Sequence, residues 1–197
     1  MKFAIAFAVA LASLAALNSA QDTVSNVDCK EAKITIGLDP GLTNTAKDIE
    51  GKLRGSSSSC TFDGKPNADP NKRNQVKITV KGNGSGSCGG SGTTSGDTKA
   101  TGIPDFSGTA TVEAWELGDK TGKKLFTVTG PVKGKITSDG ITLKGKIEEG
   151  KGEGKIIRIS GGGTSAAEKK KEAKECKSAD GYAYIEGTLD LISITDN

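Results

Sequence analysis

Apolar and polar residues alternate along most of the chain after residue 25, and this period of two constrains the fold more than any other feature. Successive side chains of a β-strand point to opposite faces, so such alternation is typical of strands with one buried and one solvated face. The runs from Ala32 to Leu38 and from Val76 to Val80 show the pattern clearly, whereas helical periodicity is almost absent. We therefore expect an all-β protein made of antiparallel strands.

Glycine recurs on the apolar face of these runs, in the pattern apolar, any residue, Gly, any residue, apolar. The pattern occurs at 49–53, 106–110, 128–132, 132–136, 143–147 and 185–189. Glycine inside a strand destabilises it by roughly 0.5 to 1 kcal/mol relative to alanine, so this repetition indicates a geometric use. Bent strands and closely approaching backbones need such positions. We favour a tightly coiled barrel or sandwich filled by aliphatic side chains over a barrel whose glycines leave room for a ligand.

Turn signals divide the chain into about nine or ten strands. Asp139-Gly140, between two aliphatic runs, is typical of a hairpin turn. After Ala114 the apolar positions change phase, which predicts either a bulge or an exit from the sheet there. One short helix is expected near 165–175. Residues 82–102 are rich in Gly, Ser and Thr, and we interpret them as a surface loop, because a domain boundary there would leave only about 60 residues before it. Residues 21–197 are therefore predicted to form one domain.

The first 20 residues are typical of a secretory signal peptide. Lys2 precedes an apolar run from Ala4 to Leu17, and small residues follow as far as Ala20. The run is shorter than the roughly 20 apolar residues that a membrane-spanning helix needs, so no membrane span is expected. We predict that the mature chain begins at Gln21 and is secreted to the extracellular space.

The chain contains four cysteines, all after the predicted signal peptide. An even number of cysteines in an exported chain implies disulfides, here two. If the first two alternating runs form a hairpin centred near residues 44 and 45, Cys29 falls opposite a position within two residues of Cys60. Adjacent antiparallel strands bring Cα atoms close enough for a disulfide. The sequence thus predicts Cys29–Cys60 and, by elimination, Cys88–Cys176.

Composition excludes several kinds of chemistry. The chain has no histidine, which removes Ser-His-Asp and Cys-His nucleophiles and His-ligated metals. No calcium-loop or phosphate-loop motif is present, and we predict no metal and no cofactor. Lys plus Arg number 27 and Asp plus Glu 24, and loss of Lys2 with the signal leaves 26 minus 24, or +2. The richest lysine cluster, 167–177, is interleaved with glutamates, so nucleic acid is not an expected partner.

Two glutamates flank the only tryptophan, at Glu113, Trp115 and Glu116. Paired carboxylates can hydrolyse glycosidic bonds, and an adjacent tryptophan can stack on a sugar ring. In a regular strand, however, Glu116 points away from the other two side chains unless the predicted bulge redirects it. We favour a packed tryptophan with solvent-facing glutamates, and keep Glu113 and Glu116 as weak catalytic candidates.

Tyr182 and Tyr184 alternate with their neighbours in the last part of the chain, which predicts that they share one face. Together with Trp115 they are candidates for a small stacking platform that binds sugar or protein. Packing over the barrel rim is the interpretation we favour. Asn83-Gly84-Ser85 is the only Asn-x-Ser/Thr sequence in the mature chain, so Asn83 is a glycosylation candidate in a eukaryotic secretory route.

These observations favour a secreted, non-catalytic binding or interaction protein that acts at or outside the cell surface. Its expected partner is a protein or a cell-surface glycan, belonging to a host or neighbouring organism. The alternative is a carboxylate-dependent enzyme that acts on glycans. A third hypothesis is a barrel that carries a small hydrophobic ligand. Neither the oligomeric state nor the strand order follows from the sequence.

Overall fold

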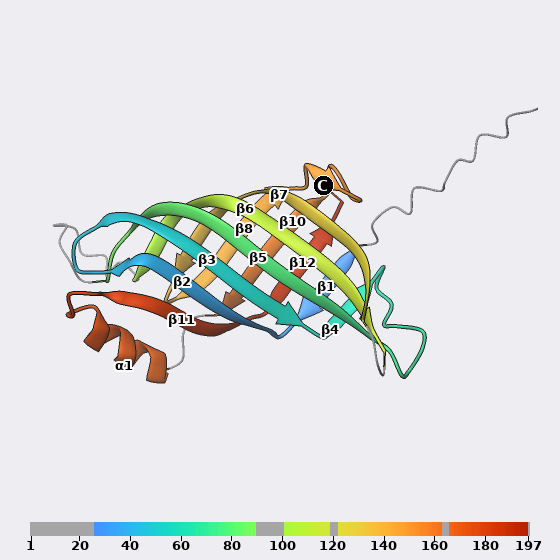
Figure 1. Ribbon diagram of the computed structural model, residues 1–197, viewed down its shortest axis with the longest axis horizontal. Helices are drawn as coiled ribbons and strands as arrows, with labels where there is room; N and C mark the ends of the chain where they lie inside the picture. The colour runs from blue at the N-terminus through green and yellow to red at the C-terminus, as the bar shows by residue number, and fades with distance from the viewer. Residues whose placement is uncertain (1–25, 90–100, 119–121, 163–165, 197) are drawn as a thin grey trace, which may run out of the picture.

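The computed structural model describes residues 26–89, 101–118, 122–162 and 166–196, which form one curled antiparallel sheet and one helix (Figure 1). The predicted all-β antiparallel class is thus confirmed. The signal peptide predicted at 1–20 lies outside the described residues. In chain order the strands are β1 (Val27–Lys30), β2 (Ala32–Leu42), β3 (Lys47–Ser57), β4 (Ser59–Phe62), β5 (Arg73–Gly86), β6 (Gly102–Leu117), β7 (Gly122–Thr137), β8 (Gly140–Lys146), β9 (Glu149–Gly150), β10 (Ile156–Gly162), β11 (Tyr182–Leu189) and β12 (Leu191–Thr195).

The N-terminal hairpin has the register that the alternation predicted. Ile36 pairs with Leu53 in β2 and β3, and Cys29 pairs with Cys60 in β1 and β4. Both pairs fit one continuous antiparallel register, so β1 and β2 are two halves of one run, broken at Glu31, which has a φ of 54°. The sheet contains twelve strand segments, compared with the nine or ten predicted, partly because such long runs are divided.

The hydrogen-bonded path runs β11-β2-β3-β5-β6-β7-β8-β10-β12-β1-β4, with β9 pairing only with β7. Its two ends are joined by the chain itself. β11 and β12 are separated only by Asp190, and the pairing of Ala32 with Leu189 continues in register as the pairing of Cys29 with Ile192. The sheet therefore curls back on itself like the wall of a barrel (Figure 1).

The inner face of the curled sheet carries the aliphatic side chains, which form one buried cluster. The repeated glycines serve close packing within this cluster and between strands. A Cβ on Gly51 would lie 3.0 Å from the ring of Phe106, and one on Gly145 would collide with the carbonyl oxygen of Pro131. These contacts support the interpretation that the glycines allow backbones and rings to approach closely.

The Gly-rich stretch predicted as a loop at 82–102 is shorter than expected. β5 continues to Gly86 and β6 begins at Gly102, so the first residues of the stretch belong to the sheet. Gly82 lies opposite Gly108, and its position has no room for a Cβ, because that atom would be 2.5 Å from the Cα of Gly108. Glycine at this position allows β5 and β6 to pair closely. The Gly, Ser and Thr content of the stretch had predicted a loop there instead. Residues 90–100 lie outside the described part of the chain.

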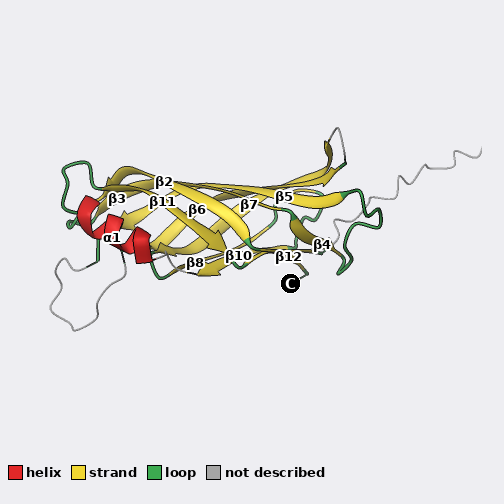
Figure 2. Cartoon of the chain, turned by 90° about the horizontal axis from the view of Figure 1, so that it is seen from below, coloured by secondary structure: helices red, strands yellow, loops and turns green. Residues whose placement is uncertain are grey.

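The helix α1 (Ala166–Glu175) lies within two residues of its predicted bounds and next to β11, at one end of the sheet (Figure 2). Both predicted disulfides are present, with Cα–Cα distances of 4.1 Å for Cys29–Cys60 and 5.9 Å for Cys88–Cys176. The second bond ties the residue after α1 to the chain that follows β5. In the described ranges, no helix has the length and apolar character needed to cross a membrane.

Candidate functional site

The predicted bulge beside Trp115 is present and separates the two candidate glutamates. The register of β6 against β7 shifts between Ala114 and Trp115. Glu113 accepts a hydrogen bond from Lys124 and forms an ion pair with it. Glu116 forms a 2.9 Å ion pair with Lys72 and accepts a hydrogen bond from Asn67. We call these two ion pairs the paired cluster.

The ion pairs of the paired cluster lower the pKa of both glutamates. The hydrogen bond from Lys124 is the main cause for Glu113, and the hydrogen bond from Lys72 is the main cause for Glu116. A glycosidase needs one carboxyl group with a raised pKa, because that group must donate a proton to the leaving oxygen. The electrostatics at Glu113 and Glu116 act in the opposite direction. The described residues also contain no group of three or more acidic or thiol side chains placed to hold a metal ion.

Trp115 is half-buried and lies beside ammonium groups. Lys77 Nζ is 4.9 Å from the centre of its ring, and Lys124 Nζ is 5.1 Å from it. The indole Nε1 is buried without a hydrogen-bond partner. Cation–π contacts therefore engage the ring that was a candidate for sugar stacking.

The expectation that Tyr182 and Tyr184 share one face is wrong. The register of β11 against β2 is irregular between them, which turns Tyr182 into the core, where it is fully buried. Its hydroxyl donates a hydrogen bond to Glu168 of α1, and burial raises the pKa of Tyr182. Tyr184 points outward and is 42% exposed. The favoured packing role thus fits Tyr182. Tyr184 is the exposed ring of the two, and Lys171 Nζ of α1 lies 5.6 Å from its centre.

Asn83 lies in β5, where it pairs with Glu50 of β3 and Ser107 of β6. Its side chain is exposed. Glycan acceptors are more commonly found in surface loops. Asn83 instead lies on the outer surface of the sheet. Glycosylation of Asn83 stays a prediction.

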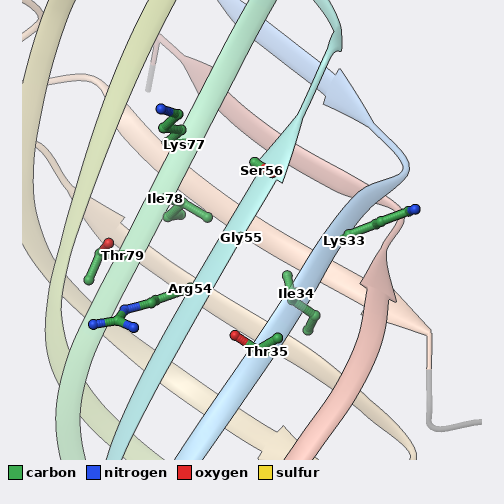
Figure 3. A pocket seen from close by; sticks show the side chains of 9 residues that line it. All are labelled: Lys33, Ile34, Thr35, Arg54, Gly55, Ser56, Lys77, Ile78 and Thr79. Atoms are coloured by element: carbon green, nitrogen blue, oxygen red, sulfur yellow. The ribbon is translucent and has the colours of Figure 1, made fainter.

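The outer surface of β2, β3 and β5 carries a group of cations that the sequence analysis missed. We call this group the basic face and define it as Lys33, Lys52, Arg54, Lys77 and Lys81. Three of these side chains line an open hollow of about 400 Å³ together with Thr35, Thr79 and their neighbours (Figure 3). A second hollow, of about 380 Å³, contains Lys77 and Lys81 and extends over β6, where Glu113 also lines it.

The strand register places the cations of the basic face against one another. Lys52 and Lys81 are direct cross-strand partners, and Arg54 is two residues from Lys52 on the same strand face. Repulsion by Arg54 is the largest cause that lowers the pKa of Lys52, followed by burial and by Lys81. In the described part of the chain, none of the basic-face side chains takes part in an ion pair. Lys77 lies opposite Glu113 of β6 and helps to lower its pKa, whereas Lys52 and Lys81 face each other directly. The fold thus holds Lys52, Arg54 and Lys81 close together without an ion-paired acid among the described residues.

A signal for the basic face was present in the sequence but is not contiguous. Its members occupy the polar positions of three separate alternating runs, at 33, 52–54 and 77–81. Cations that are neighbours in the chain are concentrated at 167–177, where glutamates lie among the lysines. Side chains on adjacent strands become neighbours only through the register.

Comparison with protein families, curated proteins and solved structures finds no match to this chain. The fold and the site by themselves define a disulfide-bonded, curled antiparallel β protein with a basic outer face.

Proposed function

We propose that this protein is an exported, non-catalytic binding protein that acts at or outside the cell surface through its basic face. The observation that carries the proposal is the set of cations on β2, β3 and β5 that lack ion pairs. Two disulfides are compatible with an extracellular location, because such bonds persist in oxidising compartments. The apolar N-terminal segment at 1–20 supports export.

The arrangement of the basic face favours a binding role over a purely structural one. Like charges directly opposite each other destabilise a strand pair, as Lys52 and Lys81 do here. Lys72 and Lys124 have glutamate partners, whereas Lys133 and Lys144 oppose each other on β7 and β8 as Lys52 and Lys81 do. The basic face differs from that second pair because an exposed ring, Tyr184, lies in its cross-strand row. An acidic partner bound to the basic face would offset the repulsion between its cations. Because the net charge of the chain is low, attraction of such a partner would come from this local group of charges and not from the protein as a whole.

The two alternative functions have less support. The enzyme hypothesis requires a carboxyl group with a raised pKa, and the pKa values of Glu113 and Glu116 are lowered. The carrier hypothesis requires a pocket lined mainly by apolar and aromatic side chains. The two hollows over β2, β3, β5 and β6 are open, and no aromatic side chain is among the described residues that line them. Ile34 and Ile78 line the first beside Lys, Arg, Ser and Thr, and Glu113 lines the second beside Lys and Thr.

The proposal can be tested by following the protein after export. The full chain is expressed in a eukaryotic culture, and the labelled protein from the medium is added to intact cells. We expect it to appear in the medium with both disulfides formed and to be retained on cell surfaces. Retention of the variant Lys52→Gln/Arg54→Gln/Lys81→Gln should be strongly reduced. Material that stays inside the producing cell, or that no tested cell surface retains, would contradict the proposal.

A further inference from the structure

The basic face combines its cations with hydroxyl groups in a regular array. The register aligns Thr35, Arg54, Thr79 and Thr111 across β2, β3, β5 and β6. Neighbouring strands lie about 4.8 Å apart, so Arg54 has a threonine hydroxyl group one strand away on each side, at Thr35 and Thr79. Ammonium and guanidinium groups pair with sulfate or carboxylate, and threonine hydroxyls both donate and accept hydrogen bonds. Such an array suits a ligand that carries anionic groups and hydroxyl groups at short, repeated intervals.

The next row of outward positions ends at an exposed aromatic ring. Tyr184, Gly37, Lys52 and Lys81 are cross-strand neighbours in β11, β2, β3 and β5. Nothing lies within 4 Å of where a Cβ of Gly37 would be, so the outer surface is open at that position between Tyr184 and Lys52. Lys171 Nζ of α1 lies 5.6 Å from the centre of the Tyr184 ring and adds a cation at this margin. A tyrosine ring beside an open, polar strip provides an apolar surface on which a sugar ring can stack.

The same surface is poorly suited to two other acidic partners. Among the described residues, Tyr184 is the only exposed large hydrophobic side chain, so the basic face lacks apolar groups that would enter a lipid layer. Single-stranded nucleic acid is normally held by several stacked aromatic rings, and this row offers one. A double helix is bound by a helix or ribbon that enters a groove, and the basic face lies on the outer wall of a curled sheet.

We propose that the basic face, with Tyr184 at its margin, binds an acidic polysaccharide that bears sulfate or carboxylate groups. This inference rests on the proposed function and names the class of its partner. The chain of sugars would lie across the strands, with anionic groups on Lys52, Arg54 and Lys81, sugar hydroxyls on the threonines, and one sugar ring on Tyr184.

A second row of cations on the same sheet provides a matched control. Lys133, Lys144 and Arg158 are cross-strand neighbours on β7, β8 and β10, and all three are exposed. Replacing them with glutamine removes the same charge from the molecule as the triple replacement in the basic face. The pair of variants therefore separates a local site from attraction to net charge.

The experiment measures retention of the oxidised full chain on immobilised heparin, which carries sulfate and carboxylate groups, and on polygalacturonate, which carries carboxylate groups only. Neutral dextran, anionic phosphatidylserine vesicles and single- and double-stranded DNA are tested in parallel at equal ionic strength. We expect binding to one or both acidic polysaccharides and none to dextran. The variant Lys52→Gln/Arg54→Gln/Lys81→Gln should bind tenfold or more weakly, since three charge-assisted contacts are lost, and Lys133→Gln/Lys144→Gln/Arg158→Gln within about twofold of the parent.

Several results would overturn the inference. One is an equal loss of polysaccharide binding in the two triple variants. The others are no binding to either acidic polysaccharide, or binding to vesicles or DNA that is tighter than binding to the polysaccharides. The unfolding midpoint of each variant is measured in urea, and the exposed glutamines are expected to leave it near that of the parent. Retention on intact cells that does not depend on acidic polysaccharide would leave the proposed function standing and remove only this inference.

Discussion

Lysine is used in two different ways on the outside of this sheet. In the paired cluster, at the ends of β5, β6 and β7, Lys72 and Lys124 each hold a glutamate. On the basic face, Lys52 of β3 and Lys81, farther along β5, face each other without an ion-paired acid in the described ranges. Both regions have the same backbone support, so the strands themselves do not account for the difference.

The comparison separates charges that the fold compensates from charges that it leaves available. Exposed ion pairs contribute little to stability, typically below about 1 kcal/mol, and so the paired cluster is a weak structural device. Opposed lysines are slightly unfavourable for folding and become favourable only with an anion bound. The difference indicates that the stability of the sheet comes from its inner face and its disulfides, while the outer face is free to serve binding.

The largest effect is expected from removing a disulfide that stabilises the sheet on which both regions lie. Replacing Cys88 and Cys176 with serine should lower the free energy of unfolding by about 3 kcal/mol, because the bond closes a long loop. Urea unfolding is followed by the fluorescence of Trp115, which reports on the paired cluster, and by retention on acidic polysaccharide, which reports on the basic face. We expect both signals to disappear at the same urea concentration. Two separate midpoints would show that the regions do not depend on one cooperative sheet.

Charge reversal within the basic face should affect binding and stability in opposite directions. In Lys81→Glu a carboxylate would lie opposite Lys52, so repulsion becomes attraction and stability should rise by about 0.5 kcal/mol. Binding to an acidic polysaccharide should weaken by about tenfold, or 1.4 kcal/mol. The matched variant Lys124→Glu, which would face Glu113, should lower stability slightly and leave binding unchanged. Loss of stability in Lys81→Glu would argue against repulsion on the basic face.

Removal of the aromatic ring at the margin should have a smaller effect. Tyr184→Ala is expected to weaken polysaccharide binding about threefold, which corresponds to the loss of one stacking contact of about 0.7 kcal/mol. Tyr184→Phe should bind like the parent, because the ring is retained. Both variants can be compared by titration calorimetry. Equal binding by Tyr184→Ala and the parent would exclude stacking on this residue.

The smallest effects concern pH, and they should have opposite signs in the two regions. Hydrogen bonding to Glu116 raises the pKa of Lys72, so its contribution to stability is full below the unfolded pKa and is lost as pH rises through the folded pKa. Repulsion, mainly from Arg54, lowers the pKa of Lys52, so its unfavourable contribution disappears as pH rises through its lower folded pKa. Urea unfolding from pH 8 to pH 11 of Lys72→Met, Lys52→Met and the parent measures both. At pH 8 the free energy of unfolding should be lower for Lys72→Met than for the parent, and higher for Lys52→Met. Both differences should shrink as the pH rises. Parallel curves for the three proteins would contradict the assignment.

Much of the fold follows from local pattern. Alternation identified the inner face, and the hairpin centred near residues 44 and 45 brought Cys29 opposite Cys60, because a period of two fixes which residues oppose each other once a turn is placed. The phase change after Ala114 predicted the bulge for the same reason. The pattern failed at Tyr182 and Tyr184, where an irregular register turned one ring inward against α1. The irregularity between Tyr182 and Tyr184 has no signal in the alternation, since it involves pairing with β2 and contact with α1, which are distant in the sequence.

The sequence by itself determined the class of fold, the two disulfides and the buried face of the regular strand runs, since these depend on short-range periodicity and on hydrophobic burial. Only the tertiary structure decided which outward side chains become neighbours. Lys52 and Lys81 are 29 positions apart in the chain and meet because β3 and β5 pair in one register. A displacement of that register by two residues would leave the inner face just as apolar and would move these two lysines out of opposition, and so the basic face is a property of the assembled sheet.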